Sequence, residues 1–257
     1  MEPSRAPVDN PATVAAVPAS PTLGQKLWGW LLDYGYVSYW MARAILGRSR
    51  TDQRLHPASQ PRSPVLLIPG VFESWRFMQP VADHLYRRGH PVHVLDQLGF
   101  NTGAIADMAV IVADYLDREG LEDVTVIAHS KGGLIAKQAL AQPGTFARVR
   151  HLVTVNTPFS GSRYAAFILL PSVRMFAPNG PVIRALSLAT AANQRVSSLY
   201  SVFDPHIPET SHLDGAENIV LSTIGHFRPL AAAQTLDLIT EILDRPVTTP
   251  GPAALSP

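Results

Sequence analysis

One serine of this chain has the surroundings of a catalytic nucleophile. Ser130 lies in Val124-Thr-Val-Ile-Ala-His-Ser-Lys-Gly-Gly133, between residues that suit a buried strand and a helical run over 134–140. A strand that reverses directly into a helix must pack its backbone closely at the turn. This explains the small residues Ala128 and Gly132, two positions before and after the serine. Such a turn would expose the hydroxyl of Ser130 at the start of the helix, as in the nucleophile elbow Gly-x-Ser-x-Gly.

A reactive serine requires a general base, and the base requires a carboxylate to orient it. After an elbow of this kind the chain order is serine, acid, histidine. His226 satisfies this order, because it follows a convincing strand over 218–224 and precedes a helix. Asp204 directly ends the strand over 196–203. We therefore predict that Ser130, Asp204 and His226 form a catalytic triad.

The remaining histidines fit the role of base less well. His56, His84, His90 and His93 precede the serine, and His151 begins a strand at the wrong edge of the sheet. We expect His129 to point away from the elbow, and His206 and His212 to be exposed loop residues.

An oxyanion hole needs two backbone N–H groups directed at the developing charge. One should belong to Lys131, the residue after the nucleophile. The other should come from the loop after the first strand, where Gly70 allows a close approach and favours the N–H of Val71 over that of Phe72. We expect the side chain of Lys131 to be solvated.

The elements that would position these residues alternate between strand and helix signals. Strands are predicted over 64–70, 91–98, 124–129, 151–156, 196–203 and 218–224, and helices over 76–88, 105–118, 131–141 and 230–243. Repeated alternation of this kind predicts an α/β fold, with a mostly parallel sheet of about six strands and helices on both faces.

An apolar insertion interrupts this alternation over about 160–194. In open α/β sheets the ligand site lies at the carboxyl ends of the strands, so an insertion after a strand would cover that edge. We expect a small cap that forms an apolar wall of the substrate pocket; alternatively, the insertion packs as one more covering helix. The candidate pocket residues are Phe72, Phe159, Phe167 and Ile168.

Taken in order, these motifs resemble the α/β-hydrolase superfamily, and within it the small bacterial triacylglycerol lipases and esterases. The similarity covers about residues 64–243 and rests on Ile-Pro-Gly-Val-Phe-Glu-Ser-Trp75, Ala-His-Ser-Lys-Gly-Gly133, Asn-Thr-Pro-Phe-Ser-Gly-Ser162, Tyr-Ser-Val-Phe-Asp-Pro-His-Ile-Pro208 and Ile-Gly-His226. Two positions depart from the pattern: Pro69 stands where many relatives have a histidine, and Ala128 replaces the first elbow glycine.

The resemblance implies a serine hydrolase that cleaves carboxylic esters through an acyl-enzyme, with no cofactor and no metal. The apolar insertion favours esters of acyl-lipid type, so the expected partner is a small-molecule ester or a lipid. An acyltransferase with the same triad is the alternative. A non-catalytic binding protein on this fold is a third interpretation, against which the complete set of serine, aspartate and histidine argues.

Composition sets the limits of the folded unit. The chain has 257 residues, of which 46% are hydrophobic and 16% charged, enough for one large α/β domain, which we place at 51–245. A net charge of +1 gives no reason to expect nucleic acid, and the lack of cysteine excludes disulfides and thiolate chemistry. The proline-rich segments 1–22 and 246–257 are predicted to be disordered tails.

An amphipathic helix is predicted within residues 23–50. Over 23–46 the polar side chains occupy a narrow arc, and Trp, Leu, Ile and most Tyr side chains cover the rest. The helix could pack on the domain or lie on a membrane surface. A membrane-spanning helix is disfavoured because the segment is barely long enough to cross a bilayer and contains the charged residues Asp33 and Arg43. No cleavable signal peptide is evident, so we expect a cytoplasmic protein with membrane contact through 23–46.

Overall fold

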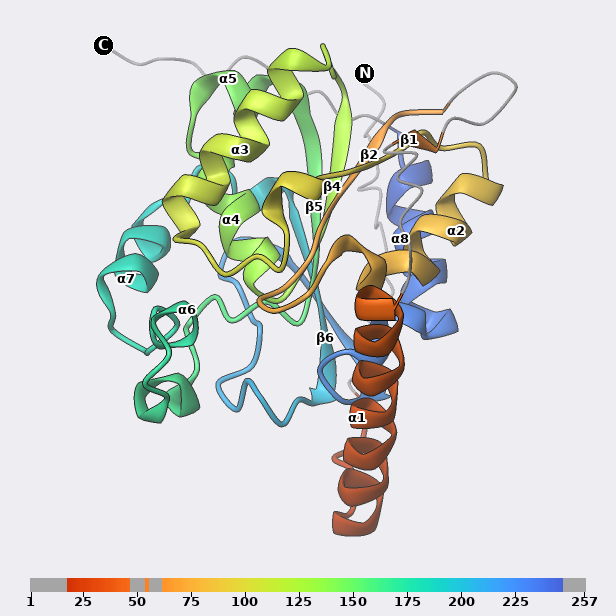
Figure 1. The fold of residues 1–257 in the computed structure, drawn as a ribbon, viewed down its shortest axis with the longest axis vertical. Coiled ribbons are helices and arrows are strands. Elements are labelled where there is room, and N and C mark those ends of the chain that lie inside the picture. Colours follow the sequence, from red (N-terminus) through yellow and green to blue (C-terminus); the bar gives the residue numbers. More distant parts are fainter. Residues whose placement is uncertain (1–17, 47–53, 56–61, 247–257) are drawn as a thin grey trace, which may run out of the picture.

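The structure is a computed structural model that describes residues 18–46, 54–55 and 62–246 (Figure 1). Residues 1–17 and 247–257, which make up most of the two predicted tails, lie outside the described residues, as do residues 47–50 of the predicted N-terminal helix.

The centre of the fold is a sheet with the strand order β1-β3-β2-β4-β5-β6-β7. The first strand, β1 (Arg54–Leu55), pairs antiparallel with β3 at one edge. All other pairs are parallel. Their strands are β2 (Val65–Ile68), β3 (Val92–Val94), β4 (Val124–His129), β5 (Val149–Val155), β6 (Val196–Phe203) and β7 (Glu217–Ile224). The prediction of a mostly parallel sheet of about six strands is confirmed.

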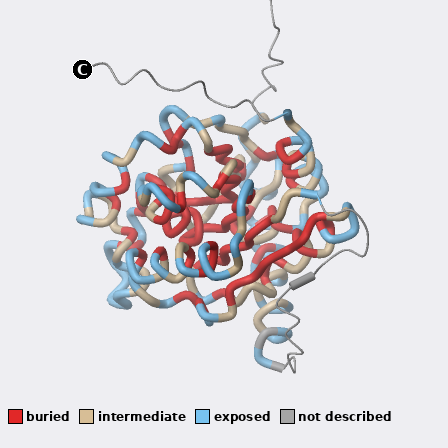
Figure 2. The backbone as a smooth tube through the Cα atoms, turned by 90° about the horizontal axis from the view of Figure 1, so that it is seen from above, coloured by how far each residue is buried: buried red, intermediate tan, exposed pale blue. Residues whose placement is uncertain are grey.

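Side chains of the central strands alternate between two apolar layers because successive residues of a strand point to opposite faces. Leu66 and Ile68 pack in the layer that contains α3 and α4, and Val65 and Leu67 in the layer that contains α2 and α8. The two helix pairs lie on opposite sides of the sheet in Figure 1, and the buried residues concentrate in the interior of the fold in Figure 2. The helices are α2 (Gln79–Arg87), α3 (Ile105–Arg118), α4 (Lys131–Leu140), α5 (Pro143–Arg148) and α8 (Ala233–Asp244).

Two predicted elements differ from the structure. The strand predicted over 91–98 ends at Val94, and the chain turns into a 3₁₀ helix, Asp96–Leu98, which places Leu95 and Leu98 in the apolar layer of α3. The helix predicted over 76–88 is two elements, a 3₁₀ helix at Trp75–Met78 and then α2. The second element begins beside Pro80, whose fixed backbone and missing N–H suit a first helical turn.

The insertion forms short helices at the carboxyl edge of the sheet. It contains a 3₁₀ helix (Arg163–Phe167), α6 (Pro171–Arg174) and α7 (Pro181–Leu188). Phe176, Ile183 and Leu186 are buried in the layer of α3 and α4. The insertion therefore combines the two expected arrangements: part of it packs as a covering layer, and part of it forms a cap over the site.

Helix α1 (Leu23–Leu46) packs on the domain through one stripe and extends beyond it (Figure 1). Gly29 is so close to β7 that a Cβ there would collide with Ile224. Asp33 is fully buried, and the Tyr36 hydroxyl donates to the carbonyl of Phe77 at 2.9 Å. Within the described part of the chain, no helix combines the length and apolarity needed to cross a membrane.

Candidate active site

Ser130 occupies a strained turn between β4 and α4. Its φ of 50° and ψ of −121° lie in a region that non-glycine residues rarely adopt. The turn is held by the N–H of Ser130, which donates to the carbonyl of Val155 at 2.9 Å. A Cβ on Gly132 would collide with the carbonyl oxygen of Ile68, and one on Gly133 with the side chain of Thr157. Close backbone packing thus dictates the small residues that follow the serine.

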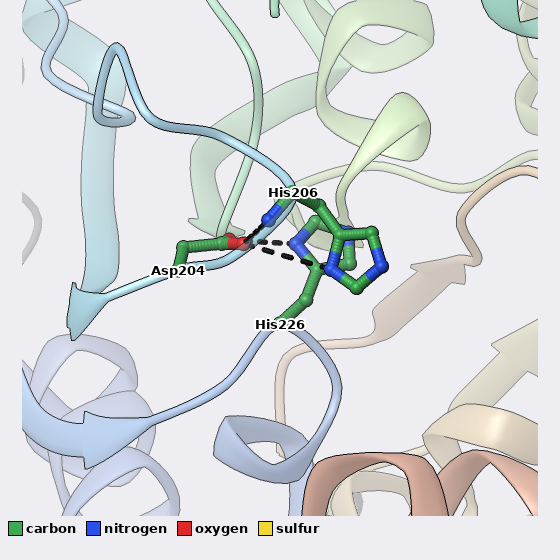
Figure 3. Close-up of side chains that lie close together, drawn as sticks. All are labelled: Asp204, His206 and His226. Atoms are coloured by element: carbon green, nitrogen blue, oxygen red, sulfur yellow. Dashed lines mark hydrogen bonds and ion pairs between the residues drawn. The ribbon is translucent and has the colours of Figure 1, made fainter. Parts of the chain in front are cut away.

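The structure brings Ser130, His226 and Asp204 together. The Nε2 atom of His226 lies 2.9 Å from the Ser130 hydroxyl oxygen, and its Nδ1 lies 2.6 Å from Oδ2 of Asp204 (Figure 3 shows the second pair). Asp204 follows β6 and His226 follows β7, so adjacent parallel strands deliver both side chains to the edge where β4 ends. This geometry allows the imidazole to take the serine proton while the carboxylate holds the opposite ring nitrogen.

The surroundings of His226 favour its charged form. Burial opposes an imidazolium, but the charge and hydrogen bond of Asp204 outweigh burial, so the pKa of His226 is raised above its ordinary value. Asp204 is itself oriented, because its Oδ1 accepts the N–H groups of His206 at 2.7 Å and Ile207 at 3.2 Å. An imidazolium that forms during proton transfer would therefore meet a fixed counter-charge.

The oxyanion loop follows β2. Within the described residues no acceptor is recorded for the N–H of Val71, which lines the pocket beside Ser130. The loop is held by Glu73, whose carboxylate accepts the N–H of Gly70 at 2.9 Å, and by Asn101, which donates to the Pro69 carbonyl at 2.7 Å. These two contacts support the loop at the position where many relatives have a histidine.

Donor atoms of Asp204, His206 and His226 lie within 4.8 Å of one another, a spacing that could accommodate a metal ion. The atoms of His226 and Asp204 are already engaged, whereas Nδ1 of His206 has no hydrogen-bond partner among the described residues. His226 uses one ring nitrogen toward Asp204 and the other toward Ser130, and Asp204 accepts two backbone N–H groups. A metal would have to displace this network, so the donor set fits a proton-transfer site better than a metal site.

A pocket of about 360 Å³ opens beside Ser130. Of the predicted pocket residues, Phe72 and Ile168 line it. The predictions for Phe159 and Phe167 are wrong. The ring of Phe159 is turned into the core, and Phe167, at the end of its 3₁₀ helix, points outward with 82% of its surface exposed. Helix α1 supplies an unpredicted wall through Val37 and Met41.

Sequence reasoning gave Asp33 no part in the site. It is fully buried, and its carboxylate accepts three consecutive backbone N–H groups, those of His226, Phe227 and Arg228, at 2.8, 2.9 and 2.8 Å. Gly225 leaves room for this carboxylate, since a Cβ there would lie 2.5 Å from Asp33 Oδ1. The position of Asp33 on the polar arc of α1 did not indicate this contact. The sequence signal that could have found it is an acidic residue among apolar neighbours, which suggests a buried carboxylate with hydrogen-bond partners.

His129, which was expected only to point away from the elbow, has contacts near the site that the sequence did not predict. Its ring lies 4.9 Å from the ring of His226, centroid to centroid. Its Nδ1 is 2.9 Å from the Glu73 carboxylate, and its Nε2 is 3.0 Å from the His226 carbonyl. Asn156 also donates to that carbonyl, at 2.8 Å. His129 therefore links the loop that carries Val71 to the loop that carries His226, and direct adjacency to Ser130 gave no hint of this.

Two further expectations about side chains are wrong. His206 is not an exposed loop residue: it lines the pocket, and its Nε2 lies 3.2 Å from the Tyr34 hydroxyl. The side chain of Lys131 is not solvated: it is fully buried, and its ammonium donates to the carbonyls of Asn101 at 2.7 Å and Gly103 at 2.5 Å. Those carbonyls take the place of water as partners of the buried ammonium. His212 is exposed, as expected.

Comparison with known proteins agrees with this architecture. Residues 63–179 match a family model described as alpha/beta hydrolase fold. Among solved structures, a lipase of Bacillus licheniformis in its mature form superposes with a TM-score of 0.56 at 15% identity, over 74% of this chain and 96% of that one. A carboxylesterase of Nitrososphaera gargenis gives 0.56 at 13% identity, over 76% of this chain and 97% of that one.

The chain therefore has the α/β-hydrolase fold, as its motifs predicted. Among curated proteins, it is 39% identical over 101 residues to RutD of Variovorax paradoxus (strain S110), which is named for an inferred carbamate hydrolase activity. That match spans 36% of this chain and 37% of the relative's length.

Proposed function

We propose that this protein is a serine hydrolase that cleaves carboxylic esters with apolar acyl groups. The observation that carries the proposal is the continuous hydrogen-bonded line from Ser130 through His226 to Asp204 at the mouth of an apolar pocket. Ser130 attacks the ester carbonyl, and His226 takes its proton and passes it to the leaving alcohol. The N–H groups of Val71 and Lys131 receive the oxyanion. Water activated by His226 then releases the acid.

The test is hydrolysis of p-nitrophenyl esters of increasing acyl length by the wild type and by the Ser130→Ala variant. We expect the variant to lose at least about 10³-fold in kcat. A fluorophosphonate probe should label the wild type and not the variant. Near-normal turnover in the variant would overturn the proposal. Adding an alcohol and measuring how the acyl group divides between water and alcohol tests the acyltransferase alternative. A p-nitrophenyl carbamate, tested in parallel, extends the assay to carbamates, the substrate class for which the relative RutD is named.

We further propose that the exposed side of α1 contacts an anionic lipid surface. Apolar side chains cover this side, with exposed fractions of 56% for Leu27, 62% for Trp28 and 61% for Leu31. Asp33 is buried and the ammonium of Lys26 lies 5.0 Å from the ring centroid of Phe203 in the domain, so the exposed charge that α1 can present to a partner is Arg43. Exposed tryptophan and leucine side chains together with an exposed arginine on one helix are typical of an interfacial helix. Val37 and Met41 of the same helix line the pocket, so a membrane-bound ester would lie close to Ser130.

A further inference from the structure

A second groove lies on α4, on surfaces that the proposed active site does not use. It has a volume of about 500 Å³ and runs between α4, the start of α5 and residues 188–192. Its walls are mainly apolar and include Leu140, Phe146 and Leu188. No residue lines both this groove and the pocket beside Ser130, so a ligand here would occupy a separate site.

Lys137 is the charged residue that lines this groove, and only 2% of its surface is exposed. Among the described residues, no hydrogen-bond acceptor and no carboxylate is recorded for its ammonium. Its recorded contact is the face of Phe159, with Nζ 5.8 Å from the ring centroid. Burial alone, without any neighbouring acid, lowers the pKa of Lys137 to about 8.

Lys131, six residues earlier on α4, provides an internal comparison. It is buried to the same degree, but two carbonyl oxygens accept its ammonium protons. Burying an ammonium without such partners is costly, and an anion that entered the groove would remove that cost. The two lysines therefore differ in role. The ammonium of Lys131 has hydrogen-bond partners within the protein, whereas Lys137 faces a groove in which a bound ligand could provide an anionic partner.

A second cation helps to define the binding surface. The guanidinium of Arg195 stacks 3.8 Å from the centroid of Phe146 and donates to the carbonyls of Phe146 and Val149. This fixes an aromatic wall and adds positive charge nearby. No aspartate or glutamate is among the lining residues of the groove. The site thus combines a recessed cation with an apolar channel that leads outward to the exposed Leu188.

We propose that this groove binds a small amphipathic carboxylate, whose anionic head pairs with Lys137 and whose apolar tail lies along Leu140, Phe146 and Leu188. The inference is independent of the reaction proposed for Ser130, because none of the groove residues takes part in that reaction.

The test uses calorimetric titration of octanoate into the full chain carrying Ser130→Ala, which keeps the result separate from any turnover. We expect saturable binding that falls at least tenfold when Lys137→Met is added and that Lys137→Arg largely retains. Octan-1-ol, which lacks the anion, should show no dependence on Lys137, and acetate, which lacks the tail, should bind at least tenfold more weakly than octanoate. Equal octanoate affinity with and without Lys137→Met would overturn the proposal, as would equal binding of acetate.

Leu188→Asp tests the same site without touching the buried lysine. Leu188 is 82% exposed, so the fold should tolerate the change, while the new carboxylate would repel octanoate and pair with Lys137. We expect at least a tenfold loss of octanoate affinity. Val110→Asp, a similar change at a half-exposed position of α3, is the control and should bind normally. Unchanged binding in the Leu188 variant would contradict the assignment of the groove.

Discussion

The carboxylate of Asp33 holds the backbone of His226, 193 positions further along the chain, through an N–H···O hydrogen bond of 2.8 Å. The same carboxylate accepts the next two N–H groups. An N-terminal helix that lies outside the matched family region thus fixes the loop that carries the proposed base. This makes α1 a part of the site as well as a wall of its pocket.

Replacing Asp33 with asparagine should disturb this loop. The amide has one acceptor oxygen in place of two, so at least one of the three N–H groups loses its partner. We expect about a 10- to 100-fold fall in kcat, the scale of a small misplacement of a catalytic group, and a free energy of unfolding lower by about 1–3 kcal/mol. Ester kinetics and chemical denaturation measure the two effects. Asp237→Asn, an exposed change on α8, is the control; a folded Asp33 variant with unchanged kcat and KM would contradict a positioning role.

The pH dependence of hydrolysis should report His226. Since its pKa is raised, the acid limb of kcat/KM should lie above pH 6.5. His206 should add no limb there, because burial, together with the charge of His226, lowers its pKa to about 4. Asp204→Asn should move the limb to lower pH and reduce kcat by about 10⁴-fold. A limb that stays in place in this variant would rule out Asp204 as the partner.

The same pKa shift carries a stability prediction with a defined sign. A raised pKa means that the folded state binds the proton of His226 more tightly than the unfolded chain. The contribution is therefore fully present below about pH 6.5, the unfolded value. It is lost as the pH rises through the folded pKa. Denaturation curves across this interval should show this loss in the wild type, and the His226→Gln variant should lose less stability over the same interval, because the contribution of His226 is absent while the other histidines still titrate.

Lys131 should contribute to stability through its side chain, beyond its backbone N–H. Lys131→Met leaves the carbonyls of Asn101 and Gly103 without their donor, which we expect to cost about 1.5–3 kcal/mol of unfolding free energy. Arg184→Met makes a comparable change at an exposed position of α7 and should be close to neutral. Equal denaturation midpoints for the two variants would show that the buried ammonium is not stabilising.

The exposed side of α1 can be tested apart from the chemistry. The double change Leu27→Glu and Leu31→Glu places two acids one helical turn apart on that side. We expect at least a tenfold loss of binding to phosphatidylserine-containing vesicles, with unchanged hydrolysis of a short soluble ester. Val110→Glu, on α3, is the matched control. Vesicle binding that survives the double change would exclude α1 as the contact.

Local chain chemistry was enough to predict much of this architecture. Small residues around Ser130, strand-like runs that end at Asp204 and before His226, and the alternation of strands and helices all follow from neighbouring residues. Chain order then limited the candidates for acid and base. Element ends were predicted less well: β3 ends early because Leu95 and Leu98 are drawn into an apolar layer that no local pattern specifies.

Tertiary structure decided what each buried polar side chain does. A helical period places Asp33 beside Lys26 on one arc of α1, but it does not say which arc meets the domain, and the partners of Asp33 are N–H groups nearly two hundred positions away. Lys131 and Lys137 likewise share a helix, yet one meets two carbonyls and the other an open groove. The physical reason is the same in each case. The energy of a buried charge depends on the groups around it in space, and folding brings those groups from distant parts of the sequence.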